Sequence, residues 1–390
     1  MALTFENTEK AFAHKSDADL AKAYRLFQTF SFPFLVNYGP KIANWAMTMG
    51  VPIKSLIKKT IFHQFCGGET IKESNQFAKK LYNNRIGAIL DYSVEGEGTA
   101  ENLKKTFQEL KRVIDEAANK PEYPFAVFKP SGIGSFSVLV AKSANEDLSK
   151  EQQNQYEELV ERIHFLCKHA YQNNVKLLID AEETWIQDAV DEIVYNNAKE
   201  FNRDDIIVYN TIQLYRKGRI EEINKQLDLA RKFGYKIGFK LVRGAYMEKE
   251  AKRAQQMNYP NPIQDTKADT DDDYNLALRI CFENRDIVAV MAGTHNEESS
   301  LLLAQLIENN NISKTDNRFW FAQLYGMSDH ISFNLAHEGF NVAKYLPYGP
   351  VKEVLPYLSR RAQENSSVKG QSSRELSLIK QEINRRKALK

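Results

Sequence analysis

The feature that most constrains the fold is the alternation of short apolar runs with long amphipathic segments between residues 87 and 349. Strands that are apolar along their whole length are typical of parallel sheets buried on both faces. A helix-compatible segment follows each run, and eight such units predict an α/β fold, a (β/α)8 barrel of the TIM type. The predicted strands span residues 87–94, 125–130, 175–182, 205–213, 236–244, 286–295, 318–324 and 341–349.

Different patterns flank the predicted barrel, so we expect three regions, at residues 1–84, 85–366 and 367–390. The first region reads as helices at 17–30, 38–49, 53–65 and 70–82, and we expect its many aromatic side chains to pack on the next domain. The basic tail has a weak apolar stripe. It is interpreted as a solvated helix, with a membrane-surface role as the alternative.

Composition excludes several classes of protein. The chain has 390 residues and a net charge of +2, and its basic residues form no patch interleaved with aromatics, which argues against a nucleic-acid partner. Cys66, Cys167 and Cys281 lack any CxxC spacing, so neither a disulfide scaffold nor a metal site is predicted. The apolar stretch at 30–51 is too short and too polar to span a bilayer, and the N-terminus does not read as a signal peptide. We therefore expect a cytoplasmic protein, soluble or peripheral on the inner face of the membrane.

Polar side chains stand at the end of every predicted strand, where a TIM barrel builds its active site. A lone lysine at such an end suits a carboxylate, a phosphate or a Schiff base. A cluster of three carboxylates in residues 180–183 suits magnesium as an alternative. The strand-end residues are Asp91, Glu95, Lys129, Asp180, Glu182, Glu183, Asn210, Gln213, Lys240, Arg243, His295, Asn296, Gln323 and Tyr345.

The last strand leads into a helix with an unusual polar end. Val351, Val354, Leu355 and Leu358 recur at helical spacing, and Arg360 and Arg361 then stand side by side, with Glu364 close behind. At least one arginine shares a helix face with this glutamate. Two guanidinium groups can chelate a planar carboxylate, so the segment is interpreted as an anion-binding lid over the active site.

The stretch YLPYGPVKEVLPYLSRRAQEN at 345–365 resembles the C-terminal signature of proline dehydrogenases, flavoenzymes that oxidise L-proline to Δ1-pyrroline-5-carboxylate. KLVRGAY at 240–246, LLIDAEE at 177–183 and GTHN at 293–296 resemble further motifs of that family. The resemblance implies FAD as cofactor and a monofunctional enzyme for the first step of proline catabolism to glutamate. It also implies hydride transfer from proline C5 to flavin N5, and delivery of the electrons to a membrane quinone.

The resemblance also implies roles for individual residues. Asp180, Lys240 and Tyr345 are expected to be catalytic, and substrate binding is expected from Lys129, Leu324, Tyr345, Arg360 and Arg361. A Glu95–Arg360 ion pair is expected to gate the site. Thr266, Lys267 and Thr270 are placed in a polar loop whose carboxylates must turn outward to admit a pyrophosphate. The cofactor contacts are expected from Asp180, Ala181, Tyr209, Gln213, Lys240, Val242, Arg243, Gly244, Ala245, Thr266, Lys267, Thr270, His295, Asn296 and Glu364.

Other functions stay open at this point. A dehydrogenase acting on hydroxyproline or another cyclic imino acid would use the same clamp, although Tyr345 favours proline itself. A lyase or aldolase would form a Schiff base on Lys129 and would lack flavin absorbance. A noncatalytic barrel would bind carboxylates through the arginines without oxidising them. No GxGxxG follows a strand, which disfavours a Rossmann-type dinucleotide site.

Overall fold

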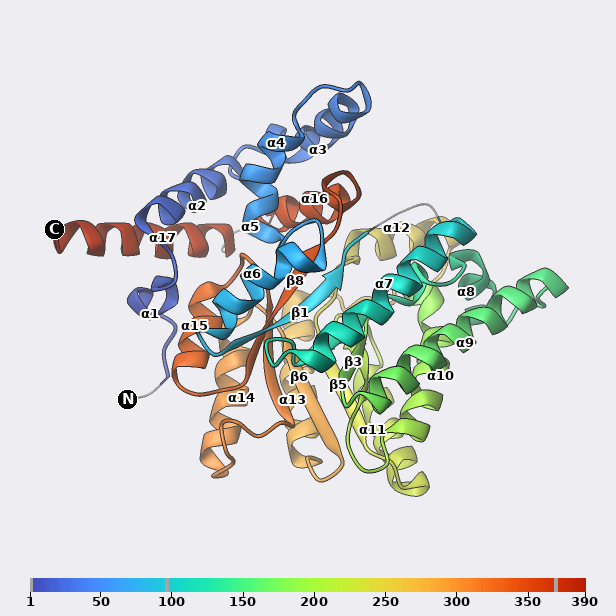
Figure 1. Ribbon diagram of the computed structural model, residues 1–390. Coiled ribbons are helices and arrows are strands. Elements are labelled where there is room, and N and C mark those ends of the chain that lie inside the picture. Colours follow the sequence, from blue (N-terminus) through green and yellow to red (C-terminus); the bar gives the residue numbers. More distant parts are fainter. Residues whose placement is uncertain (1–2, 95–97, 368–370) are drawn as a thin grey trace. The chain divides into compact units, whose positions relative to one another are not determined.

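The computed structural model describes residues 3–94, 98–367 and 371–390. Its sheet is a closed barrel of eight strands in sequence order (Figure 1), which confirms the predicted (β/α)8 class. Every predicted strand is present, and most end a few residues earlier than predicted. The strands are β1 (Ile86–Tyr92), β2 (Phe125–Phe128), β3 (Lys176–Ile179), β4 (Val208–Gln213), β5 (Ile237–Val242), β6 (Val288–Gly293), β7 (Phe319–Leu324) and β8 (Val342–Tyr348).

Helices follow the strands because the connecting segments carry apolar stripes at helical spacing and good N-caps. Thr99, for example, accepts a hydrogen bond from the backbone of Asn102 at the start of α7, and Ser149 forms a capping box with Gln152 at the start of α9. These helices are α7 (Ala100–Asn119), η2 (Pro130–Gly132), α8 (Phe136–Ser143), α9 (Lys150–Gln172), α10 (Thr184–Phe201), α11 (Arg219–Phe233), α12 (Met247–Met257), α13 (Lys267–Glu283), α14 (Glu297–Asn309), α15 (Asp329–His337) and α16 (Val351–Ser367).

The chain divides into two compact units, residues 1–96 with 323–390, and residues 97–322. In the first unit β1 pairs in parallel with β8, from Ile86 opposite Val342 to Tyr92 opposite Tyr348. In the second unit β2 to β6 and the first residues of β7 pair in parallel in sequence order. The region limits at 84 and 366 stay predictions.

The N-terminal region is helical, as predicted, but two boundaries were wrong. Helix α3 begins at Pro33, whereas the prediction began at residue 38, because proline fits the first turn, where no N–H is needed. The helix predicted at 53–65 is split by a π-helical segment that contains the non-helical residue Thr60. The elements are α1 (Thr8–Phe12), α2 (Asp17–Thr29), α3 (Pro33–Thr48), α4 (Lys54–Ile57), η1 (Lys58–Phe62), α5 (His63–Phe65) and α6 (Ile71–Tyr82).

The aromatic side chains of this region fall into two sets. Phe12, Phe27, Phe30 and Phe65 are buried in an apolar cluster that includes residues of α16 and the C-terminal helix. A second set is exposed, and for these residues the expected packing on the next domain was wrong. The exposed aromatics are Phe32, Phe34, Tyr38, Trp45 and Tyr82.

The basic tail forms helix α17 (Gln371–Ala388), which packs on α1 and α2. Leu378 and Ile379 are buried, and Arg386 donates to the carbonyl oxygens of Phe12 and Lys15 and to the Asp17 carboxylate. The prediction of a solvated tail was therefore wrong. The arginines of the tail join the two ends of the chain.

Candidate active site

Lys240 and Asp180 form a buried ion pair in the second unit. Side chains of a strand alternate between its two faces, so Gly238, Lys240 and Val242 of β5 share one face. The Lys240 ammonium donates to Asp180 Oδ1 at 2.5 Å, from β5 to the residue that follows β3. Both side chains are largely shielded from water. The structure thus brings together two residues for which the sequence predicted a catalytic role.

Gln213 is the last residue of β4 and has half of its hydrogen-bonding capacity unused. Its Nε2 donates to the backbone oxygen of Glu182 at 2.7 Å, while its Oε1 is buried without a hydrogen-bond partner. An unpaired buried acceptor costs free energy unless a ligand satisfies it. The edge of an isoalloxazine carries an N–H group, so this amide fits the cofactor that the sequence predicted.

Lys129 directly follows β2. Two residues further on, Ser131 makes a polar contact with Glu182 that the sequence did not predict. The backbone N–H and the hydroxyl of Ser131 both donate to the Glu182 carboxylate. Burial raises the pKa of Glu182 to about 7, against the Ser131 hydrogen bonds and the nearby charge of Lys129, which lower it. The segment after Lys129 begins with the 3-10 turn η2, because Pro130 favours a first helical turn.

The three carboxylates that follow β3 point to three different partners. Asp180 pairs with Lys240, Glu182 accepts from Ser131, and Glu183 pairs with Lys249 of α12. A divalent cation needs several oxygen ligands around one point. The arrangement therefore gives no support to the magnesium alternative.

Arg243 is held on the helix side of the barrel. Its guanidinium donates to Asp271 Oδ1 at 2.6 Å, to Thr294 Oγ1 at 2.6 Å and to Ser299 Oγ at 3.0 Å, and it lies over the Tyr274 ring. Asp271 is one of the carboxylates in the 265–273 segment that must turn outward to admit a pyrophosphate, and it pairs with Arg243. Its pKa is lowered, since its hydrogen bonds to Lys267 and Arg243 outweigh burial, which raises it.

The expected polar loop at 266–270 is the beginning of a helix. Thr266 is the N-cap of α13 and forms a capping box with Asp269, so Lys267 and Thr270 lie in helical positions. The signal was present in the sequence, because Thr266 is followed three residues later by an acidic residue. Lys267 pairs with Asp271, and Thr270 is buried.

Two further predicted cofactor residues, Gly244 and Asn296, have local structural roles. Gly244 has φ +147°, and a Cβ there would lie 2.4 Å from the Tyr215 ring. Asn296 is the N-cap of α14 and accepts from the backbone of Ser299. Its neighbour His295 is half-buried at the end of β6, and Ala245 is exposed.

The structure does not bring Tyr209 to the carboxyl end of a strand. Its ring packs edge-on against Phe125, the first residue of β2, with centroids 5.5 Å apart. Gly238, near the start of β5, leaves room for the same ring. Tyr209 thus belongs to the layer at the amino ends of these strands.

In the first unit, the polar end of α16 is arranged as predicted. Arg361 donates to Glu364 Oε1 at 2.5 Å and lies over the Tyr357 ring. The side chain of Arg361 is buried, and its Nε has no hydrogen-bond partner. Burial raises the pKa of Glu364, against the two arginines, which lower it. An unpaired buried guanidinium N–H is a donor suited to a carboxylate ligand.

Tyr345 and Leu324 are neighbours in the first unit. The backbone N–H of Tyr325 donates to the backbone carbonyl oxygen of Tyr345 at 2.8 Å. Leu324 packs against an apolar cluster that includes Leu355 and Leu358 of α16. Tyr345 is buried. The predicted gate partner Glu95 lies outside the described residues, so the Glu95–Arg360 pair stays a prediction.

Several strand-end residues face the helices, which the sequence could not distinguish. Asn210 donates to Asp191 of α10 at 2.9 Å, and Gln323 accepts from Ser332 of α15 at 2.8 Å. Lys344 was not predicted as a polar residue of the barrel, and its buried ammonium contacts Asp329 at 2.8 Å. A polar residue in a parallel strand can thus serve either face of the sheet.

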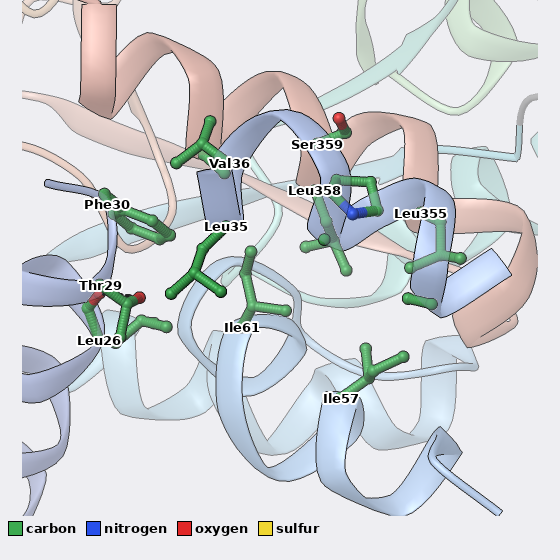
Figure 2. Close-up of a pocket in the computed structure, with 14 residues that line it drawn as sticks. Leu26, Thr29, Phe30, Leu35, Val36, Ile57, Ile61, Leu355, Leu358 and Ser359 are labelled. Carbon is green, nitrogen blue, oxygen red and sulfur yellow. Dashed lines mark hydrogen bonds between the residues drawn. The ribbon is translucent and has the colours of Figure 1, made fainter. Parts of the chain in front are cut away.

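A cavity of about 200 Å³ lies within the first unit, between α2, α3, η1 and α16 (Figure 2). The described residues that line it include Leu35, Ile61, Leu355 and Leu358, and none of those described is charged. None of the predicted site residues that the structure describes lines this cavity. Its mostly apolar walls suit a hydrocarbon better than the charged groups of an amino acid.

The structure combines a closed (β/α)8 barrel with a buried lysine–aspartate pair and an unsatisfied amide on its strands. This is the framework of barrel enzymes, a class whose active sites lie at the carboxyl ends of the strands. The family model described as proline dehydrogenase matches residues 75–374. The chain belongs to the proline dehydrogenase family.

Relatives across most of the chain agree with this assignment. "Proline dehydrogenase 1, mitochondrial" of Dictyostelium discoideum is 31% identical, over 97% of this chain and 74% of its own. "Proline dehydrogenase 2, mitochondrial" of Arabidopsis thaliana is 33% identical, over 95% and 91%. "Carbapenem antibiotics biosynthesis protein CarD" of Pectobacterium carotovorum subsp. carotovorum is 35% identical, over 83% of each.

Solved structures support the fold. Proline utilization A from Bdellovibrio bacteriovorus, inactivated by N-propargylglycine, superposes with a TM-score of 0.72 at 20% identity. The match covers 93% of this chain and 39% of that longer protein. At this identity the likeness concerns the fold alone.

Proposed function

We propose that this member of the family is an FAD-dependent proline dehydrogenase that oxidises L-proline to Δ1-pyrroline-5-carboxylate. The observation that carries the proposal is the buried Arg361, whose unpaired Nε–H is poised for a carboxylate. FAD, when bound, would accept a hydride and, with it, the two electrons that proline loses. Gln213, Lys240 and Asp180 are the residues that we propose to hold it, with Val242 and Ala181 beside them.

The protein's own contribution is positioning and charge. Arg361, assisted by Arg360 and Lys129, would hold the substrate carboxylate, and Tyr345 and Leu324 would hold the ring. A fixed carboxylate and a fixed ring leave one orientation for the C5–H bond, which lowers the entropic cost of reaching the transition state. The ion pair with Asp180 would hold the Lys240 ammonium group in a fixed position.

For three of the predicted cofactor residues we propose no contact with FAD. Arg243, Asn296 and Tyr209 already have protein partners or a position away from the strand ends. We therefore propose structural roles for them. His295, Thr266, Lys267, Thr270, Ala245 and Gly244 stay candidate contacts for the remainder of FAD, and Glu364 is proposed to orient Arg361.

We further propose that the electrons pass to a membrane quinone and that the enzyme contacts the membrane peripherally. A reaction that removes two electrons from proline needs an acceptor at each turnover. The proposal is supported by the apolar surface of α3 described below.

Anaerobic titration of the FAD-loaded protein with L-proline tests the function. We expect the flavin absorbance to bleach, and Arg361→Met to raise the proline concentration at half-bleaching about a hundredfold, since losing a buried charge-paired contact costs about 2–5 kcal/mol. Arg112→Met is the control, because Arg112 is exposed and pairs with Glu109 on α7. Flavin that stays oxidised would exclude proline.

The second candidate is oxidation of another cyclic imino acid, which the relative named for carbapenem biosynthesis keeps open. The same anaerobic titration with hydroxyproline, and with analogues of proline that have other ring sizes, tests this candidate. A protein that binds no flavin but is trapped by borohydride with a carbonyl substrate on Lys129 would point instead to a lyase.

A further inference from the structure

Helix α3 has two apolar faces, and only one of them is covered. Val36 and Ala46 are buried, and α3 packs on α16 along this side. The opposite face exposes side chains at spacings of four, four, three and four residues, which places them in one stripe. The members of this α3 stripe are Phe34, Tyr38, Ile42, Trp45 and Met49, each more than half exposed.

The residues that flank the α3 stripe extend it. Phe32, Val51 and Leu56 are also exposed, at 59%, 43% and 65%. Half of the large exposed hydrophobic side chains in the described part of the chain thus fall within 32–56. Concentrations of this kind mark protein–protein or membrane contact sites, whereas scattered exposed residues need no explanation.

The composition of the stripe suits the boundary between water and lipid. Tyr38 and Trp45 combine an apolar ring with a polar group, a combination enriched at membrane interfaces. Among the described residues no helix is both long and apolar enough to cross a membrane. With a length of about 24 Å, α3 is suited to lying in the plane of the interface.

The charge around the stripe favours an anionic surface. No aspartate or glutamate occurs between Asp19 and Glu69, an interval that contains six lysines and arginines. Lys54 and Lys58 pair with Glu69 at the end of this interval, which offsets part of their charge, and Arg25 and Lys59 are exposed. Two copies of this chain docked through the same face would place these cations against each other. Lipid phosphates would instead attract them.

We propose that the α3 stripe docks this protein on a membrane that contains anionic phospholipids. The rings of Phe34 and Trp45 enter the interface, and the basic residues of the 20–68 segment remain at the headgroup level. The inference rests on the proposed function in one respect only, because docking would bring the enzyme to the lipid phase that holds its quinone.

Co-sedimentation with vesicles tests the docking without using the enzyme's activity. We expect the protein to bind vesicles of phosphatidylcholine with phosphatidylglycerol and to bind phosphatidylcholine alone at least tenfold more weakly. Ile42→Glu/Trp45→Glu should weaken binding to the anionic vesicles at least tenfold. Leu276→Glu/Leu389→Glu is the matched control, because it adds the same charges at exposed hydrophobic positions outside the patch, and it should bind like the wild type.

Two readouts separate docking from misfolding and from the proposed function. Oxidation of proline by a water-soluble dye should be unchanged in Ile42→Glu/Trp45→Glu. Tryptophan emission should shift to the blue on vesicle binding, and Trp45→Phe should bind vesicles but lose the shift.

The docking proposal fails if the wild type ignores anionic vesicles, or if both double variants bind equally. It also fails if the wild type forms a dimer that Ile42→Glu/Trp45→Glu dissociates while neither binds vesicles, since a second copy is then the occupant. A protein that binds vesicles but does not oxidise proline would overturn the proposed function and leave the docking intact.

Discussion

At the scale of single residues, burial gives Glu182 an unusual dependence on pH. The carboxyl group contacts Ser131, is almost completely buried, and has its pKa raised to about 7 from an ordinary value of 4.5. The folded protein therefore binds the proton more tightly than the unfolded chain does. The contribution of Glu182 to the free energy of unfolding is fully present below pH 4.5, and it is lost as pH rises from there through about 7.

We expect Glu182→Gln, which mimics the neutral acid, to gain stability relative to the wild type as pH rises from 5 to 8. The gain should approach about 1.4 kcal/mol per unit of pH until the carboxyl is ionised. Urea unfolding at several pH values measures it. A difference between the two proteins that does not change with pH would contradict the raised pKa.

Gly244 provides a second prediction at this scale. A methyl group at this position would meet the Tyr215 ring at 2.4 Å, and the backbone has positive φ. We expect Gly244→Ala to lower the free energy of unfolding by about 3 kcal/mol. Gly234→Ala is the control, since Gly234 also has positive φ but open space around it, and should cost about 1 kcal/mol. Equal losses would show that backbone strain alone is responsible.

At the scale of elements, Arg386 hydrogen-bonds α17 to the N-terminal helices. Arg386 donates to the backbone oxygens of Lys15 and Phe12 at 2.8 and 2.9 Å, respectively, and to Asp17. Lys390 pairs with the same Asp17 on the surface. Of these two residues, Arg386 donates to backbone carbonyls as well as to Asp17, whereas the pairing of Lys390 is with the Asp17 carboxylate.

We expect Arg386→Ala to destabilise the protein by about 1–3 kcal/mol, because two carbonyl groups lose a charged donor. Lys390→Ala should leave the midpoint of urea unfolding unchanged, since exposed ion pairs contribute little. Circular dichroism during urea unfolding measures both. If the two variants behave alike, the ion pairs with Asp17 are what hold the helix.

At the scale of the whole molecule, Asp329 joins α15 to β8 and to the N-terminal segment. Its carboxylate contacts Lys344 at 2.8 Å, Lys15 at 3.2 Å and His14 at 3.5 Å. Although burial acts to raise it, the pKa of Asp329 is held well below its ordinary value by the charges of Lys344 and Lys15 and by the contact with His14. A lowered pKa stabilises the folded chain above the ordinary value of 3.8, and this stabilisation is lost as pH falls below it.

We therefore expect Asp329→Asn to lower the free energy of unfolding by about 3–5 kcal/mol at pH 7, because it leaves the buried Lys344 ammonium without its carboxylate partner. The difference from the wild type should shrink as pH falls below about 4. Thermal unfolding between pH 3 and 7 measures it. A cost that is the same at every pH would mean that the charge of Asp329 is not what matters.

The sequence alone determined the barrel, because strand and helix periods are local and repeat eight times between residues 87 and 349. It also determined that at least one of Arg360 and Arg361 shares a face of α16 with Glu364, since helical spacing fixes which side chains meet. It marked the strand ends as the region of the site, with Asp180, Gln213 and Lys240 among the residues named there.

Only the tertiary structure decided which strand-end residues face inward and which face the helices. Asn210 and Gln323 serve the helices, while Lys240 and Gln213 do not, and in a strand buried on both faces nothing local separates the two cases. The structure likewise decided that one face of α3 is covered and the other exposed. Both faces are apolar in the sequence, and only packing against α16 distinguishes them.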